Sequence, residues 1–142
     1  MPSFIKEVTY YKDAFTLDVA PIPVDFLREL KGLSVFDVQG KDTSRTRVIT
    51  TLIHGNEPSG FIALHHWLIE KVIPEVNIRF ILCNPESAAL PPEFSHRYLV
   101  VAQDLNRFFT LDNTPTSKKD DAISRRAEQI LKAVIEVNPE AI

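Results

Sequence analysis

The pattern that most constrains the fold is a strand, a helix and a second strand in close succession between residues 47 and 83. The segment RVITTLIHG, residues 47–55, is a nearly continuous β-branched run that fits a strand buried on both faces and stopped by Gly55. After Pro58, apolar residues recur at helical spacing, and VNIRFILC, residues 76–83, has a second buried-strand pattern. Because crossovers between parallel strands are right-handed in nearly all proteins, we expect a right-handed βαβ unit.

Weaker patterns precede and follow this unit. Residues 15–19 and 35–38 are short β-rich runs, and VDFLRELKG, residues 24–32, predicts a short helix between them. From residue 86 to residue 103 the pattern loses its period, which indicates an irregular loop, and long loops in compact domains are often functional. The chain is therefore expected to have an α/β fold with an irregular segment after the second strand of the unit.

The last predicted element is a helix. The sequence S-K-K-D from Ser117 is typical of a capping box, an apolar helical face follows it, and Asn138-Pro139 ends the helix. In residues 140–142 another strand could be starting, so we expect a sheet that is truncated at the C-terminus. An exposed sheet edge there would favour association between copies of the chain into a homo-oligomer.

Composition excludes several classes of protein. The chain is 142 residues long, 44% hydrophobic and 25% charged, which suits one globular domain. Its net charge of -3 and sequence pI near 5.8 give no electrostatic footprint for nucleic acid. Cys83 is the single cysteine, and no apolar run has the length of a signal peptide core or a membrane span. We expect a soluble, cytoplasmic protein that binds neither nucleic acid nor membrane.

The tetrapeptide HGNE, residues 54–57, stands where a predicted strand ends and a helix begins, which is where α/β sheets build their sites. Zinc prefers imidazole nitrogen and carboxylate oxygen, and Gly55 permits the sharp turn that would bring His54 and Glu57 to one ion. The alternative is that His54 caps the strand and Glu57 opens the helix, where its charge favours the helix dipole. The tetrapeptide alone favours neither interpretation.

The tetrapeptide DLNR, residues 104–107, pairs an amide with a guanidinium after the irregular loop. Arginine is suited to bidentate binding of a carboxylate, and Asn106 can add a hydrogen bond beside Arg107. The alternative is a local ion pair between Asp104 and Arg107 on a turn, which usually contributes little to stability. Taken alone, the segment favours the ion pair.

Together the motifs resemble the succinylglutamate desuccinylase and aspartoacylase family, which is related to zinc carboxypeptidases of the M14 type. The matching segments, in order, are HGNEPSG at 54–60, Asn84-Pro85, Arg97-Tyr98 and DLNRFF at 104–109. The resemblance implies a mixed, largely parallel sheet flanked by helices. We expect residues 1–142 to form a single, N-terminal part of such a catalytic domain.

The resemblance also implies roles for individual residues. His54 and Glu57 match ligands of one Zn²⁺ ion, and Asn106 and Arg107 match residues that bind the substrate's carboxylate. Arg97 matches an arginine near the scissile carbonyl, where its charge would stabilise the developing oxyanion. The implied activity is hydrolysis of the amide bond of a small N-acyl amino acid or similar carboxylate, and a carboxypeptidase acting on peptides is an alternative.

Two groups that the resemblance implies have no match among the 142 residues: a third zinc ligand, a histidine on a later strand, and a catalytic glutamate further downstream. A catalytically silent fragment or binding module is therefore a second alternative. Other residues with suitable side chains are expected to be core, surface or solvated loop residues: His65, His66, His96, Glu86, Glu93 and Cys83.

Overall fold

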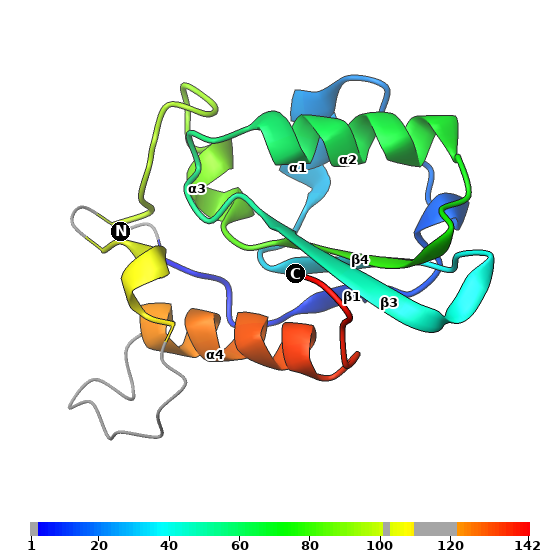
Figure 1. Ribbon diagram of the computed structural model, residues 1–142. Coiled ribbons are helices and arrows are strands. Elements are labelled where there is room, and N and C mark those ends of the chain that lie inside the picture. The colour runs from blue at the N-terminus through cyan, green and yellow to red at the C-terminus, as the bar shows by residue number, and fades with distance from the viewer. Residues whose placement is uncertain (1–2, 101–102, 110–121) are drawn as a thin grey trace.

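The structure, a computed structural model, describes residues 3–100, 103–109 and 122–142 (Figure 1). In chain order its elements are β1 (Thr9–Tyr11), the 3-10 helix η1 (Ala14–Thr16), α1 (Pro23–Glu29), β2 (Ser34–Val38), β3 (Asp42–Thr51), α2 (Ser59–Glu70), β4 (Val76–Leu82), α3 (Pro85–Ala89), the 3-10 helix η2 (Leu105–Arg107) and α4 (Ala122–Ile135).

The strands form one sheet in the order β1-β2-β4-β3. The β1 and β2 strands run parallel, β3 and β4 run parallel, and β2 and β4 are antiparallel. The expected α/β fold with a mixed, mostly parallel sheet is therefore confirmed. Since β3 and β4 are parallel, their carboxyl ends lie at the same edge of the sheet, which is where such folds place their sites.

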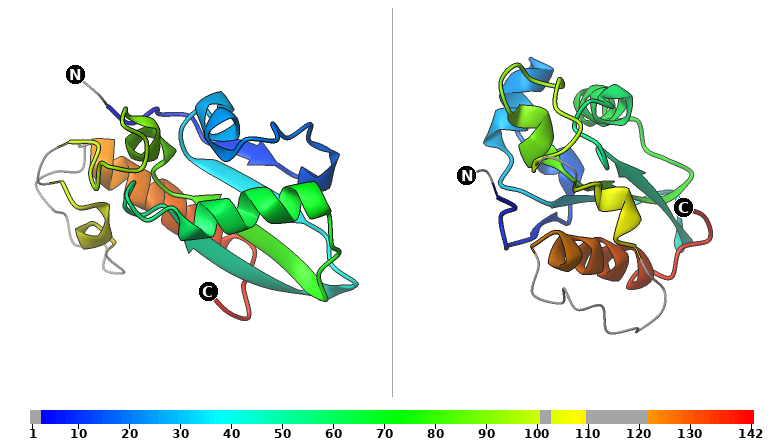
Figure 2. Two further views of the ribbon diagram at one scale, coloured as in Figure 1. Left: turned by 90° about the horizontal axis from the view of Figure 1, so that it is seen from above. Right: turned by 90° about the vertical axis from the view of Figure 1, so that its left-hand side faces the viewer.

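Helices cover both faces of the sheet (Figure 2). The α2 helix buries Phe61, Leu64 and Leu68 against one face, in the same cluster as Phe36 and Leu82 of the strands. The α4 helix covers the opposite face with a second cluster, whose members include Val35, Ile81, Ile123 and Ile130.

The predicted strand, helix and strand are present as β3, α2 and β4, but β3 is not buried on both faces as expected. It lies at the end of the strand order, and Ile49 is 39% exposed. The central strand is β4, where Ile81 and Leu82 are fully buried. A β-branched run is favourable in any strand, so it did not distinguish an edge strand from a central one.

The predicted strand at residues 15–19 is wrong. Ala14–Thr16 form a 3-10 helix instead, and the Phe15 ring makes a T-shaped contact with Trp67 of α2, with 5.0 Å between ring centroids. The first strand of the sheet is Thr9–Tyr11, which lies earlier in the chain. The other two early elements are confirmed as α1 and β2.

The prediction of an irregular loop at residues 86–103 is wrong in its first part, because Pro85–Ala89 form the short helix α3. Asn84 caps it by accepting a hydrogen bond from the Ser87 amide at 3.1 Å, and Pro85 occupies the first turn. Residues 90–100 have no further helix or strand. The α3 helix thus sits directly after β4, beside the turn that carries His54.

The last predicted helix is confirmed as α4, whereas the capping box at Ser117 lies outside the described residues. After α4 the chain returns to the sheet, and Ala141 forms a parallel bridge with Arg47 on the free side of β3. The Val48 amide donates to the Ala141 carbonyl at 3.0 Å. Residues 140 and 141 therefore pair with β3 through an isolated bridge, which does not form a strand. No helix in the described ranges is long and apolar enough to cross a membrane.

Candidate metal and substrate site

The HGNE turn connects β3 to α2 at the carboxyl edge of the parallel strands (Figure 1). His54 is 6% exposed, while the Glu57 side chain is 54% exposed. The Glu57 amide donates to the His54 carbonyl at 3.3 Å, which closes the turn and puts both side chains on one side of it. The turn therefore places one buried and one accessible ligand-type group together.

Both ring nitrogens of His54 face carboxylates. Nδ1 lies 3.1 Å from Glu57 Oε1, and Nε2 lies 2.8 Å from Asp104 Oδ1. The tautomer that carries its hydrogen on Nε2 would donate to Asp104 and leave the Nδ1 lone pair free for a metal ion. The hydrogen bond from His54 also holds the pKa of the Asp104 carboxyl below its usual value.

This geometry fits two ligands of one zinc ion. Nitrogen and oxygen ligands lie about 2.0 to 2.2 Å from zinc, so two of them at a tetrahedral angle are about 3.3 to 3.6 Å apart. The observed separation of 3.1 Å between His54 Nδ1 and Glu57 Oε1 is slightly shorter, so a small outward movement of the exposed Glu57 side chain would admit the ion. Over the described ranges, however, no group of three or more His, Cys, Asp or Glu side chains could hold a metal ion.

Gly55 lies at a close approach between the HGNE turn and the loop that follows α3. A Cβ atom at Gly55 would lie 2.4 Å from the His96 carbonyl oxygen and 2.5 Å from Ser87 Oγ. The Gly55 amide donates to the Arg97 carbonyl at 3.1 Å, and the Ser87 hydroxyl donates to the His96 carbonyl at 2.8 Å. Only glycine leaves room for these contacts, which fix residues 96 and 97 beside the turn.

Arg97 extends its guanidinium toward the same pair of side chains. Its Nη1 lies 3.6 Å from Glu57 Oε1, and its Nε donates to the Tyr98 hydroxyl at 3.1 Å. The hydrogen bond to Tyr98 raises the pKa of Arg97. The Tyr98 ring in turn meets the His54 ring edge-on, with 6.0 Å between centroids. A positive charge therefore stands next to His54 and Glu57 without being buried, since the Arg97 side chain is 44% exposed.

The DLNR segment forms η2 on the other side of His54. Leu105 is buried, and Asp104 Oδ1 accepts a hydrogen bond from the Asn106 amide at 3.0 Å. Arg107 Nε lies 3.9 Å from Asp104 Oδ2, and its side chain is 80% exposed. The short side-chain contact of Asp104 is therefore with His54. The ion pair between Asp104 and Arg107, which the sequence favoured, is present but long at 3.9 Å.

A comparison with known families now bears on this arrangement. The sequence profile described as the succinylglutamate desuccinylase/aspartoacylase catalytic domain matches residues 43–141. The chain belongs to the succinylglutamate desuccinylase/aspartoacylase family. No curated protein and no solved structure matched it. The matched range contains every residue for which the sequence predicted a role in the site.

In this member of the desuccinylase/aspartoacylase family, a buried ion pair between Arg126 and Glu86 lies next to the site. The Arg126 side chain on α4 is fully buried and donates to both oxygens of Glu86 at 2.9 and 2.5 Å, and to the Cys83 carbonyl at 2.9 Å. The expectation that Glu86 is a solvated loop charge is therefore wrong. The pair joins α4 to the first turn of α3, which carries Ser87 beside the HGNE turn.

The other candidate side chains of this family member are engaged elsewhere. His65 is buried and its Nε2 lies 2.8 Å from the Ala20 carbonyl, while His66 is exposed and pairs with Glu70. His96 Nε2 lies 3.0 Å from the Pro91 carbonyl. The two remaining candidates are Glu93, which pairs with Arg28, and Cys83, whose burial raises its pKa to about 12.

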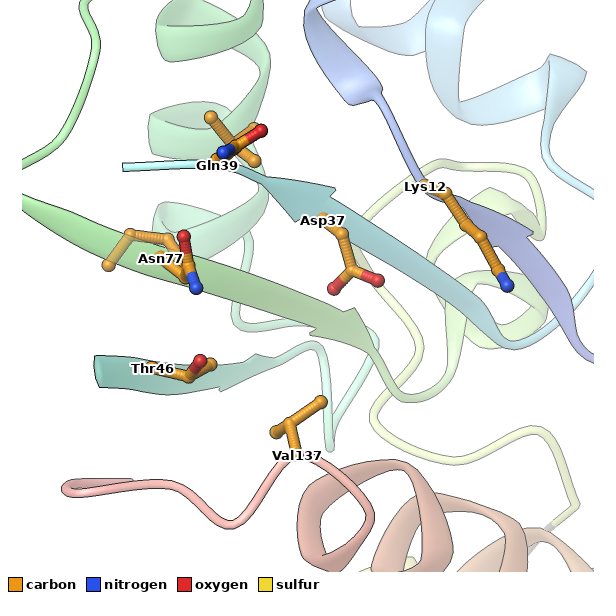
Figure 3. A pocket seen from close by; sticks show the side chains of 8 residues that line it. Lys12, Asp37, Gln39, Thr46, Asn77 and Val137 are labelled. Atoms are coloured by element: carbon orange, nitrogen blue, oxygen red, sulfur yellow. The ribbon is translucent and has the colours of Figure 1, made fainter. Parts of the chain in front are cut away.

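A cavity of about 260 Å³ is lined by Asn77 at the start of β4, and therefore lies at the opposite end of the parallel strands from His54. Figure 3 shows Lys12, which directly follows β1, and Asp37 of the neighbouring strand β2 at this cavity, with Val137 across from them. Asp37 is held by Arg79, which donates to both of its oxygens at 2.7 and 2.8 Å. None of the side chains that line the cavity belongs to the motifs of the desuccinylase/aspartoacylase family.

Proposed function

We propose that this chain carries the zinc-binding and substrate-orienting part of an amide hydrolase that acts on a small N-acyl amino acid or a similar carboxylate. The observation that carries the proposal is the arrangement of His54: Nε2 contacts Asp104, and Nδ1 faces Glu57 at 3.1 Å. A neutral histidine with one nitrogen fixed by a carboxylate is the usual form of a zinc-ligating imidazole.

In this proposal His54 and Glu57 hold the ion, and Asp104 fixes the orientation and tautomer of the His54 ring. When bound, zinc supplies Lewis acidity and lowers the pKa of water toward neutrality. The Arg97 guanidinium lies beside Glu57 and presents its charge to a carbonyl oxygen as that oxygen becomes negative. Each of these groups is held before substrate arrives, which reduces the reorganisation needed during the reaction.

Asn106 and Arg107 are proposed to bind the substrate's carboxylate. Both are exposed, and the Arg107 side chain is 80% exposed, so its guanidinium is available for a bidentate contact. A C-terminal peptide also presents a carboxylate, so hydrolysis of peptides shares this part of the proposal. The location of the protein in the cytoplasm stays a prediction from the sequence.

The test compares His54→Ala with His66→Ala. Both remove an imidazole, but His66 lies on the exposed side of α2, where its partner among the described residues is Glu70. Titration of the metal-free chain with Zn²⁺ should show binding that His54→Ala weakens at least about tenfold and that His66→Ala leaves unchanged. Equal zinc binding by both variants and the wild type would overturn the metal assignment.

A second candidate is a binding module without turnover. It is favoured by the pairing of His54 and Glu57 with no third ligand in the described part of the chain. The same protein samples separate the two candidates when they are assayed for release of free amine from N-acetyl amino acids and from a dipeptide. Zinc-dependent amine release that His54→Ala abolishes supports the hydrolase, whereas zinc binding without release supports the module.

A further inference from the structure

We propose that Tyr98 is a positioning residue that holds the guanidinium of Arg97 beside Glu57. The inference rests on the proposed function only for the role of Arg97 in hydrolysis. The positioning itself concerns contacts between side chains of this chain, and these can be measured without substrate or metal.

The backbone at residues 96 and 97 is fixed independently of Tyr98. The Gly55 amide donates to the Arg97 carbonyl at 3.1 Å, and the Ser87 hydroxyl donates to the His96 carbonyl at 2.8 Å. These two bonds attach the loop to the HGNE turn on one side and to α3 on the other. The Cα atom of Arg97 is therefore placed, but an arginine side chain has several further rotatable bonds and loses considerable freedom when it is held in one conformation.

Tyr98 supplies the contacts that restrict this side chain. Its hydroxyl oxygen accepts a hydrogen bond from Arg97 Nε at 3.1 Å, and the Arg97 Cζ atom lies 5.5 Å from the centroid of its ring. Attraction between a guanidinium and an aromatic face operates at this distance. The ion pair of Arg97 with Glu57 is longer, at 3.6 Å, and both of its side chains are about half exposed, so it restrains the guanidinium weakly.

Tyr98 also contacts His54. The Tyr98 and His54 rings meet edge-on at 79° with 6.0 Å between centroids, and His54 is 6% exposed. A side chain that touches both the buried imidazole and the guanidinium sets the position of one relative to the other. Tyr98 thus positions the Arg97 guanidinium relative to His54, which the proposed function assigns as a zinc ligand.

Arg107 is the second arginine of the site and can be compared with Arg97. Its contact among the described residues is the 3.9 Å approach to Asp104, and its side chain is 80% exposed, compared with 44% for Arg97. The two arginines therefore provide an internal comparison within one molecule. If Tyr98 holds Arg97, the Arg97 guanidinium is ordered and the Arg107 guanidinium is not.

The experiment measures the heteronuclear NOE of the Arg97 Nε–Hε group in ¹⁵N-labelled protein, with the resonance assigned by its loss in Arg97→Lys. Tyr98→Phe keeps the ring and removes the hydroxyl, and Tyr98→Leu removes both. The expected order of Arg97 rigidity is wild type, then Tyr98→Phe, then Tyr98→Leu, with the last close to Arg107. Tyr10→Phe, a change on exposed β1, is the matched control and should leave Arg97 unchanged.

Equal rigidity of Arg97 in wild type, Tyr98→Phe and Tyr98→Leu would overturn the inference, and so would an Arg97 that is as mobile as Arg107 in the wild type. Thermal unfolding of each variant separates loss of positioning from loss of fold.

In an amide hydrolysis assay, Tyr98→Phe should lower kcat about tenfold with little change in KM, because the Arg97 guanidinium is misplaced while the contacts to the substrate's carboxylate remain. Absence of hydrolysis in the wild type would overturn the proposed function, and the NMR result would still decide the inference.

Discussion

The two segments that meet at the site, residues 54–57 and 104–107, differ in how firmly their side chains are held. Residues 54–57 join a strand directly to a helix, and His54 is buried between two carboxylates. Residues 104–107 form a single 3-10 turn that is attached through Asp104 and the buried Leu105. At the outer end of each segment Glu57 is 54% exposed, whereas Arg107 is 80% exposed.

The difference corresponds to what each segment has to do in the proposed function. A metal site requires ligand atoms within a few tenths of an ångström of their positions, so its residues gain from close packing. Binding of a carboxylate by an arginine and an asparagine tolerates an adjustment of flexible side chains when the ligand arrives. We therefore expect substitutions in the 54–57 segment to affect stability more than substitutions in the 104–107 segment.

The largest effect on stability is expected for Gly55→Ala. The added methyl group would lie 2.4 Å from the His96 carbonyl oxygen and 2.7 Å from the Ala88 amide nitrogen, and backbone atoms cannot move away without shifting α3 or the loop. The free energy of unfolding in urea should fall by about 3 kcal/mol, as expected for overpacking at a rigid site. Asn56→Ala, an exposed neighbour in the same turn, should change it by less than about 0.5 kcal/mol. Similar values for the two variants would contradict the close packing of this segment.

An intermediate effect is expected for Asp104→Ala, which cuts the contact between the two segments. It leaves the Nε2–H group of the buried His54 without its acceptor and removes the cap on the Asn106 amide. The cost in unfolding free energy should be about 2 kcal/mol. Asp104→Asn keeps an acceptor oxygen in place, so it should cost about 1 kcal/mol or less while still weakening zinc binding about tenfold. An Asn variant as unstable as the Ala variant would show that the charge, and not the acceptor, joins the segments.

Local patterns predicted those parts of the fold that depend on neighbours in the sequence. Helical spacing of apolar residues predicted α2 and α4, and the apolar run at residues 76–83 predicted β4. The same reasoning failed for β3, because whether a strand is central or at an edge depends on strand order and not on its own residues. It also failed at residues 15–19, where packing of Phe15 on Trp67 accompanies a 3-10 turn in place of a strand.

Contacts over long distances in the sequence explain what was missed at the site. His54 and Asp104 are 50 positions apart, so no local pattern assigns Asp104 as the acceptor of the histidine, although it stands in a recognised motif. Glu86 and Arg126 are 40 positions apart. For that pair a signal was present, since Arg126 lies among Ile123, Ala127 and Ile130 on the apolar face of α4, and a buried arginine requires an acidic partner.

The smallest effect on stability is expected for Arg107→Ala, and it is also the substitution that best separates the two segments by function. The side chain is 80% exposed and its one approach to Asp104 is 3.9 Å, so its removal should change the unfolding free energy by less than about 0.5 kcal/mol. Loss of a charge-assisted contact to a carboxylate should still weaken binding of an N-acetyl amino acid about tenfold or more, measured by calorimetry. Lys132→Ala, in the last turn of α4, provides a control for the loss of one surface charge and should leave binding unchanged. Arg107→Ala is thus expected to preserve stability and reduce affinity. A variant that lost stability but kept its affinity would contradict the assignment of residues 104–107 as the adaptable segment that binds the substrate.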